Sequence, residues 1–232
     1  MLGRAWRFYI VVAVLAPAPV WAGMSLSLEA KQDTFVLGEP VRVTLTATND
    51  TSEPIETALV LQPDAGMVLF YVSEGSGNFK RYIGPGWGTR DVYLLPSPVA
   101  PGASFSTDFE LLWHNALPGA PQDLARNLAF PEPRCYELKV RSLLPHFDTE
   151  SNIIEFCTTT PTGQDLAVWD SIVEEPELAR FVQRPTALVS ETVRKRAETL
   201  LEQNQSSKNA PRLEQALRVR RDFDARKAAQ EN

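Results

Sequence analysis

The sequence has 232 residues, of which 44% are hydrophobic and 22% charged, and its formal net charge is −6. The hydrophobic fraction excludes a disordered chain, and the acidic balance does not fit a nucleic-acid-binding protein. Two cysteines and two histidines are too few for a disulfide-dense scaffold and leave few ligands for a metal site. We therefore expect a globular protein of one large or two small domains, with no metal and no cofactor.

Residues 1–22 have the pattern of a secretory signal peptide. A basic start precedes an apolar run at 8–16, and the small residue Ala22 closes the segment. The alternative, a transmembrane anchor, needs about 18 or more apolar residues, and Pro17 interrupts the run too early. We expect cleavage near Ala22 and a mature chain without a transmembrane segment, exported to the periplasm or the cell exterior.

Residues 23–160 are predicted to form an antiparallel immunoglobulin-like β-sandwich. At 41–48, apolar residues alternate with Arg and Thr, which is the period of a half-buried strand. Similar short stretches recur between turn-forming residues without an intervening helical pattern, as is typical of two packed sheets. This part carries 9 basic and 17 acidic residues. The expected strands are 25–30, 41–48, 55–61, 67–73, 79–83, 92–95, 104–112, 135–143 and 152–159.

The last two of these strands are predicted to pair as a hairpin that sets Cys135 opposite Cys157. An exported protein meets oxidants, so this register favours a disulfide, which would stabilise the fold by about 3 kcal/mol. The same register sets Glu137 opposite Glu155, and like charges in direct opposition are unfavourable. A register shifted by two residues instead pairs Lys139 with Glu155 and leaves the cysteines diagonal.

Residues 161–232 are predicted to form a small helical C-terminal region, because apolar residues recur there at spacings of three and four. Thr162 and Ser190 are expected N-caps. The expected helices are 163–174, 176–183, 190–204 and 211–229. The last helix has a thin apolar stripe and three more basic than acidic residues. Three interpretations stay open for it: it docks on the acidic sandwich, it binds an acidic partner, or its end frays.

No catalytic motif occurs in the sequence, neither a nucleophile elbow nor a zinc-protease helix nor a phosphate-binding loop. His114 and His146, the two histidines, lie in expected loops or strand ends. A hydrolase would therefore need a site assembled in space from distant residues. We predict a non-enzymatic protein with no catalytic residue, and keep such a hydrolase as the weaker alternative. Trp113 beside His114 is an aromatic candidate for which burial is the favoured interpretation.

The segment 79–90 is chemically distinctive, because aromatic and basic side chains surround a glycine-rich turn. Glycines near Trp87 leave few side chains to cover its indole. An exposed tryptophan with tyrosine and arginine neighbours is a common anchor for a peptide or a glycan. We predict Trp87, Tyr82 and Arg90 as binding residues. In the alternative, Trp87 folds back and closes the open end of the sandwich.

Two stretches of the β part resemble exported immunoglobulin-like domains of bacteria. They are 27–43 (SLEAKQDTFVLGEPVRV) and 133–140 (PRCYELKV), the second with Arg134 where the usual pattern P-G-x-Y-x-L-x-V has glycine. The resemblance implies that Tyr136 forms a tyrosine corner, with its hydroxyl bonded to backbone upstream. The set is also loosely similar to the bacterial intracellular proteinase inhibitor fold. Residues 197–217 resemble one tetratricopeptide-type unit, whereas a stable array needs three or more.

These observations leave two main hypotheses from different classes. The first is an exported, non-enzymatic binding module whose sandwich loops contact a protein or glycan partner. The second is a proteinase inhibitor of the sandwich type, although no inhibitory loop can be transferred to this chain from the resemblance. Neither hypothesis involves nucleic acid.

Overall fold

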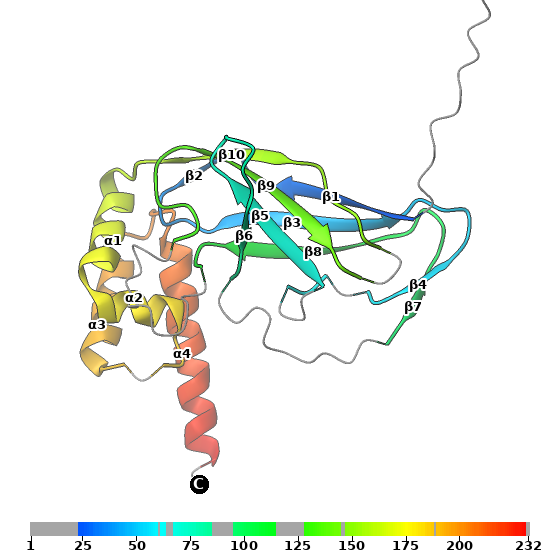
Figure 1. Cartoon of the computed structure of the whole chain (residues 1–232). Helices are drawn as coiled ribbons and strands as arrows, with labels where there is room; N and C mark the ends of the chain where they lie inside the picture. The colour runs from blue at the N-terminus through cyan, green and yellow to red at the C-terminus, as the bar shows by residue number, and fades with distance from the viewer. Residues whose placement is uncertain are drawn as a thin grey trace, which may run out of the picture.

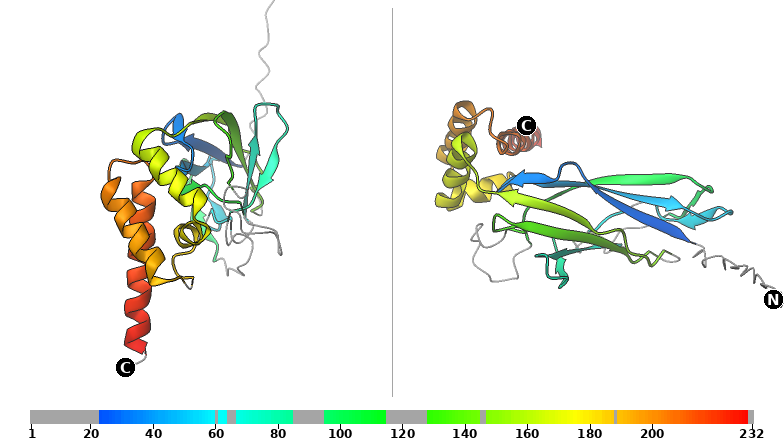
Figure 2. Two further views of the ribbon diagram at one scale, coloured as in Figure 1. Left: turned by 90° about the vertical axis from the view of Figure 1, so that its left-hand side faces the viewer. Right: turned by 90° about the horizontal axis from the view of Figure 1, so that it is seen from above.

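The computed structural model describes residues 23–59, 61–63, 67–84, 95–114, 128–144, 147–187 and 189–230. Within these ranges ten strands are followed by four helices, and the helices gather at one end of the strands (Figures 1 and 2). The expected signal peptide at 1–22 lies outside the described residues, as does the expected strand at 92–95 apart from Leu95.

The strands are β1 (Met24–Ala30), β2 (Thr34–Val36), β3 (Val41–Asn49), β4 (Ile55–Thr57), β5 (Val68–Ser73), β6 (Lys80–Tyr82), β7 (Ser97–Val99), β8 (Ser104–Leu111), β9 (Cys135–Ser142) and β10 (Ile154–Thr159). The helices are α1 (Gly163–Glu174), α2 (Pro176–Gln183), α3 (Glu191–Gln203) and α4 (Ala210–Gln230). Strands β2 and β7 were not expected, because each has three residues, too few to display a period of two.

The described strands form a three-stranded sheet in the order β1-β3-β8 and a five-stranded sheet in the order β2-β10-β9-β5-β6. Strands β4 and β7 form a separate pair. Pairing is antiparallel except between β2 and β10, which run parallel. The expectation of antiparallel pairing is therefore wrong at the edge formed by β2 and β10. Strands β1 and β3 belong to the three-stranded sheet, whereas β2, which lies between them in the sequence, belongs to the five-stranded sheet.

One hydrophobic core contains buried side chains from both larger sheets. Val43 and Leu45 of β3 are fully buried in it, as are Leu138 and Val140 of β9. The ring of Phe70 in β5 meets the ring of Phe109 in β8 edge to face, with 5.0 Å between centroids. Alternation of apolar and polar residues along each strand thus produces a shared core, because successive side chains point to opposite faces.

A second hydrophobic core holds the helices together at one end of the strands. Leu112, Trp113 and Leu128 join it from the strand region, so the helices are packed against the strands. Arg212 of α4 also lies 3.5 Å from the carboxylate of Glu110 in β8. The first half of α4 therefore docks on the strand region, which was one of the three open interpretations. The second half extends away from the strands (Figure 1).

Of the two expected N-caps, one is confirmed and one is wrong. In α1, Leu166 and Val173 are exposed, because the helix packs through Val168 and Ile172, which lie on another side of its surface. Thr162 makes no side-chain capping bond. Ser190 caps α3, since its hydroxyl accepts a hydrogen bond from the backbone N–H of Val193 at 3.4 Å.

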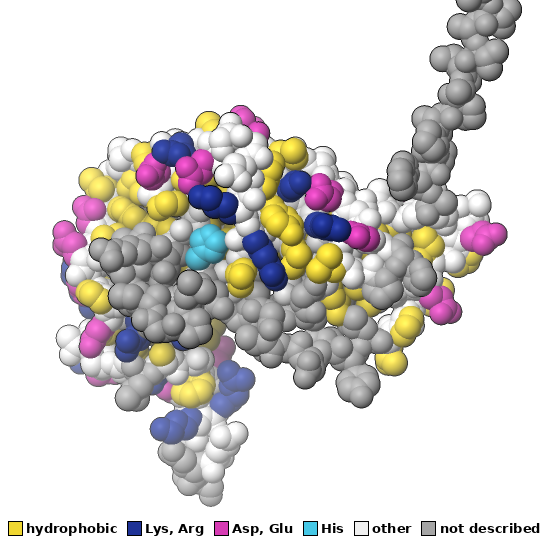
Figure 3. Space-filling view, in the orientation of Figure 1, with side chains coloured by type: hydrophobic (Ala, Val, Ile, Leu, Met, Phe, Trp, Pro, Cys, Tyr) yellow, Lys and Arg dark blue, Asp and Glu magenta, His cyan; other side chains and the backbone are white. Residues whose placement is uncertain are grey.

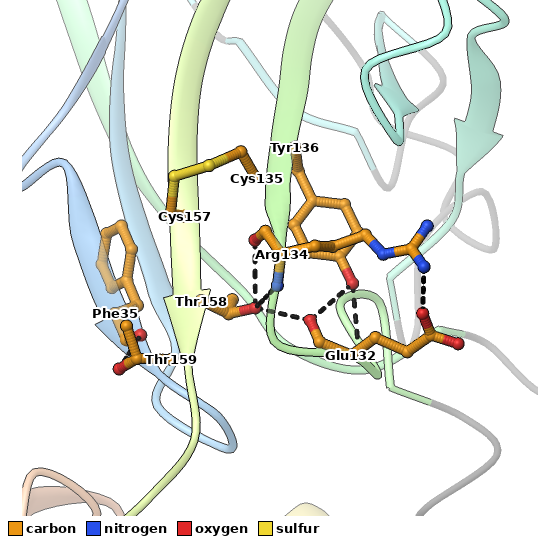
Figure 4. Close-up of a disulfide and its surroundings, with 8 residues drawn as sticks. All are labelled: Phe35, Glu132, Arg134, Cys135, Tyr136, Cys157, Thr158 and Thr159. Carbon is orange, nitrogen blue, oxygen red and sulfur yellow. Dashed lines mark hydrogen bonds and ion pairs between the residues drawn. A yellow bond between two sulfur atoms is a disulfide. The ribbon is translucent and has the colours of Figure 1, made fainter.

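Strands β9 and β10 pair in the unshifted register, with Cys135 opposite Cys157 and Glu137 opposite Glu155. A disulfide joins the two cysteines (Figure 4). Lys139 does not pair with Glu155, because its ammonium group lies 2.8 Å from a carboxylate oxygen of Glu150. Two glutamates thus lie directly opposite each other in this sheet. The disulfide, two positions away on each strand, fixes this register.

Tyr136 anchors the chain that enters β9. Its hydroxyl donates to the carbonyl of Glu132 at 2.9 Å and accepts from the N–H of the same residue at 3.1 Å. Thr158 of β10 donates to that carbonyl as well, at 2.6 Å (Figure 4). The bond from the tyrosine hydroxyl to upstream backbone is the one that the tyrosine-corner resemblance implied.

Helix α1 contacts the strand region at Gly38, in the turn between β2 and β3. Gly38 has φ +88°, and a Cβ atom there would lie 2.5 Å from Cε3 of Trp169. Two independent reasons therefore favour glycine at position 38: its backbone conformation, and the indole packed where a side chain would begin.

We predict that Gly38→Ala lowers the free energy of unfolding by about 2–4 kcal/mol, the sum of backbone strain and overpacking. Gly102→Ala is the matched control, because Gly102 has φ +72° but open space around its Cα. It should cost about 1–2 kcal/mol. Urea unfolding of both variants measures the difference, and equal losses would contradict the packing of Trp169 on Gly38.

We also predict that denatured, unreduced protein has no free thiol, because the chain's two cysteines are bonded to each other. Replacing both with serine should lower the free energy of unfolding by about 3 kcal/mol. Thiol titration and urea unfolding test the two statements, and two titratable thiols would disprove the first.

Candidate functional site

The candidate site surrounds β6, an edge strand of the five-stranded sheet. Its residues Lys80 and Arg81 are exposed, whereas Tyr82 is only 2% exposed. The hydroxyl of Tyr82 donates to the carbonyl of Trp113 at 2.8 Å, and burial raises the pKa of Tyr82 well above its usual range. Tyr82 was expected to be a surface contact, but its side chain is buried and forms one wall of a pocket.

Trp113 and His114 lie against this wall. Trp113 is 4% exposed, which agrees with the interpretation favoured for it. The ring of His114 lies 4.9 Å from the ring of Tyr82, centroid to centroid. His114 is half-buried, and this burial lowers its pKa below the usual value. The imidazole is therefore mostly neutral at pH 7, and it lines one of the pockets.

The first pocket, which we call the polar pocket, has a volume of about 130 Å³. Hydrogen-bonding side chains from the segment between β5 and β6 converge on it, together with Lys80 and His114. The ammonium group of Lys80 forms no ion pair or hydrogen bond with any of the described residues. The lining residues are Val72, Glu74, Ser76, Asn78, Lys80, His114, Ala129 and Tyr136.

Basic side chains gather on the face of β9, β5 and β6 (Figure 3). Most are neutralised by acidic partners: Arg134 lies 2.7 Å from Glu74, and Arg141 lies 2.9 Å from Asp148. Arg81, like Lys80, has no such partner among the described residues. On these three strands, the basic side chains without an acidic partner among the described residues therefore belong to β6, where Lys80 and Arg81 point to opposite sides of the strand.

The second pocket, which we call the junction pocket, lies between the strands and the helices and has a volume of about 240 Å³. Arg212 of α4 faces Glu110 of β8 across it, and Glu110 also accepts a hydrogen bond from Arg42 at 3.1 Å. Burial lowers the pKa of Arg212, and the charge of Glu110 opposes this effect. The lining residues are Tyr82, Gly84, Glu110, Leu112, Trp113, Gln183 and Arg212.

Two of the three expected binding residues, Trp87 and Arg90, lie outside the described residues, as does His146. In the part of the chain that the structure describes, no three His, Cys, Asp or Glu side chains are grouped so that they could hold a metal ion. No helix in those ranges has both the length and the hydrophobicity to cross a membrane. Sequence analysis missed Arg212 and Gln183, because only tertiary packing brings them to β6.

No protein-family model matches this chain, and no curated protein matches its sequence. Solved structures with a related backbone include a β-glucosidase from Erythrobacter marinus, with a TM-score of 0.34 and 12% identity over 59% of this chain and 15% of that chain. An alkylpurine DNA glycosylase from Pseudomonas fluorescens bound to DNA has a TM-score of 0.32 and 14% identity, over 60% of this chain and 31% of that chain. The chain thus spans less than a third of either enzyme.

A CARDB domain from Pyrococcus furiosus, in complex with two metal ions, has a TM-score of 0.30 and 7% identity, over 59% of this chain and 87% of that chain. Likenesses as weak as these three do not indicate what the protein does, so its function is argued below from its own residues.

We predict that His114 makes stability fall in mild acid. Because burial lowers the pKa of His114, the unfolded chain binds the proton more tightly, and stability is lost as the pH falls through the unfolded value of about 6.5. His114→Phe keeps an aromatic ring beside Tyr82 but cannot titrate. Urea midpoints at about pH 7.5 and about pH 5.5 should therefore differ less in this variant. His146→Phe is the control, and an unchanged difference in His114→Phe would contradict the prediction.

Proposed function

We propose that the protein is an exported, non-enzymatic binding module that holds a protein or glycan partner beside β6. The single observation that carries this proposal is the polar pocket, in which the ammonium group of Lys80 has no partner among the described residues. We propose further that the strand region is an immunoglobulin-like β-sandwich. The core shared by its two larger sheets and the hydroxyl bond of Tyr136 support that assignment.

The size and lining of the polar pocket favour one contact of a larger partner. Pockets that enclose a small molecule have volumes of about 300–1,000 Å³, whereas this one has about 130 Å³. Ser76, Asn78 and Lys80 offer donors and acceptors at its edge. Such a hollow accepts a single side chain or the hydroxyl edge of one sugar unit, while the rest of the partner lies on the surrounding surface.

The expected binding residues are close to this pocket along the chain. Gly84, two residues after β6, lines the junction pocket together with Tyr82. Trp87 follows Gly84 by three residues, so covalent geometry alone keeps their Cα atoms within about 11 Å of each other. We propose that Trp87 and Arg90 contact the same partner as Lys80, with the buried Tyr82 supporting the strand from which the loop starts.

Export is part of the proposal. The basic and apolar pattern of residues 1–22 supports cleavage near Ala22, and the disulfide between Cys135 and Cys157 fits an oxidising compartment. A binding module in the periplasm or outside the cell meets proteins and glycans of the envelope.

We predict that the double variant Asn78→Ala, Lys80→Ala weakens partner capture about tenfold or more, which is the loss of roughly 1.4 kcal/mol or more of contact energy. Arg81→Ala is the matched control, because Arg81 has the same charge and exposure on the same strand but does not line the pocket. Quantitative pull-down from the host's envelope fraction and a glycan array provide the measurement, with circular dichroism as the test of folding.

Trp87→Ala should weaken the capture of the same partner by a similar factor. If both the double variant and Trp87→Ala are folded and retain every partner at the level of the Arg81→Ala control, the proposed site is wrong.

A further inference from the structure

Two buried N–H groups, both in residues that line the junction pocket, have no acceptor among the described residues. They are Nε1 of Trp113 and Nε of Arg212. Trp113 is 4% exposed, and the side chain of Arg212 is 19% exposed. A buried donor left without an acceptor costs about 1–3 kcal/mol, and native structures rarely keep one without a bound water or ligand. Both donors belong to residues that line one hollow, although neither nitrogen is itself open to water. An acceptor oxygen in the hollow would reach them after a small movement of the indole or the guanidinium.

The charge of the pocket favours an anionic acceptor. Glu110 is the carboxylate that faces Arg212, at 3.5 Å from Nη1, and it is shared with Arg42. Because Glu110 is shared by Arg42 and Arg212, the three groups together carry a net charge of +1. An added anion would pair with the guanidinium, whose planar donors match the two oxygens of a carboxylate.

The shape of the pocket favours a small group over a stacked sugar ring. Its volume is about 240 Å³, room for several atoms beyond a carboxylate, since one water takes about 30 Å³ in the liquid. The aromatic rings in its lining, those of Tyr82 and Trp113, are 2% and 4% exposed. They therefore offer no open face for a sugar, while the amide of Gln183 supplies a further polar contact.

We propose that the junction pocket binds a carboxylate group, held by the guanidinium of Arg212 and the indole N–H of Trp113. The carboxylate belongs either to a free small acid or to the C-terminal end of a peptide, which present the same two oxygens. Arg212 and Gln183 come from helices and Trp113 from the end of β8, so the bound group bridges the strand and helical regions. This site goes beyond the binding function proposed above, because neither Asn78 nor Lys80 lines it.

The test follows the indole N–H resonance of Trp113 in NMR spectra of the full mature chain, assigned by its loss in Trp113→Phe. The probes are sodium acetate, N-acetyl-alanyl-alanine and the amide of that dipeptide, with sodium chloride at matched ionic strength. We expect a saturable downfield shift with the two carboxylates and no saturable shift with the amide or chloride. Tighter binding of the dipeptide than of acetate assigns the site to a peptide end, and the reverse order assigns it to a free acid.

Arg212→Gln should weaken carboxylate binding at least tenfold. Arg218→Gln, an exposed arginine of the same helix that does not line the pocket, should leave it unchanged. If Arg212→Gln does not fold, Arg212→Lys serves instead: it keeps the charge but loses the paired donors, and it should also weaken binding. The proposal is overturned if neither carboxylate gives a saturable shift, if the amide binds as tightly as the acid, or if the folded Arg212 variant binds like the Arg218→Gln control.

Discussion

Between Leu111 and Leu112 the chain passes from one hydrophobic core to the other. Leu111, the last residue of β8, is fully buried in the core of the strands, and Leu112 belongs to the core of the helices. Successive residues of an extended chain point in opposite directions, so the end of β8 is held from both sides. Glu110, Leu112 and Trp113, on both sides of this point, line the junction pocket. The next residue, His114, lines the polar pocket. The helices are therefore part of the framework on which both pockets depend.

Much of the secondary structure follows from local patterns in the sequence. The expected bounds of α1 and α2 agree with the structure, and β3 begins at the expected Val41. The alternation of apolar residues in a strand, and their spacing by three and four in a helix, can be recognised within the segment itself. The buried side of α1 is not such a property, because Val168 and Ile172 are buried by residues from the other helices and from the end of the strand region. The parallel pairing of β2 likewise depends on β10, which is the last strand in the sequence.

The candidate site was predictable only in part, for a related reason. The pattern of 79–90 pointed to β6, whose residues line both pockets, but composition does not tell which side chain of an edge strand is buried. Tyr82 turns inward, and Lys80 provides the accessible charge. Arg212 and Gln183 carry no signal in the sequence, since they are an ordinary arginine and glutamine on amphipathic helices. They gain a role through the docking of α2 and α4 at the end of β8.

The pairing of β2 with β10 has a consequence for how the chain acquires its structure. The hydroxyl of Thr159 donates to the carbonyl of Phe35, 124 residues earlier, so this edge cannot close until the last strand has been synthesised. Contacts so distant along the chain give a high contact order, which slows folding. Under the export proposed above, the edge between β2 and β10 closes only after residue 159 has reached the compartment in which the chain folds.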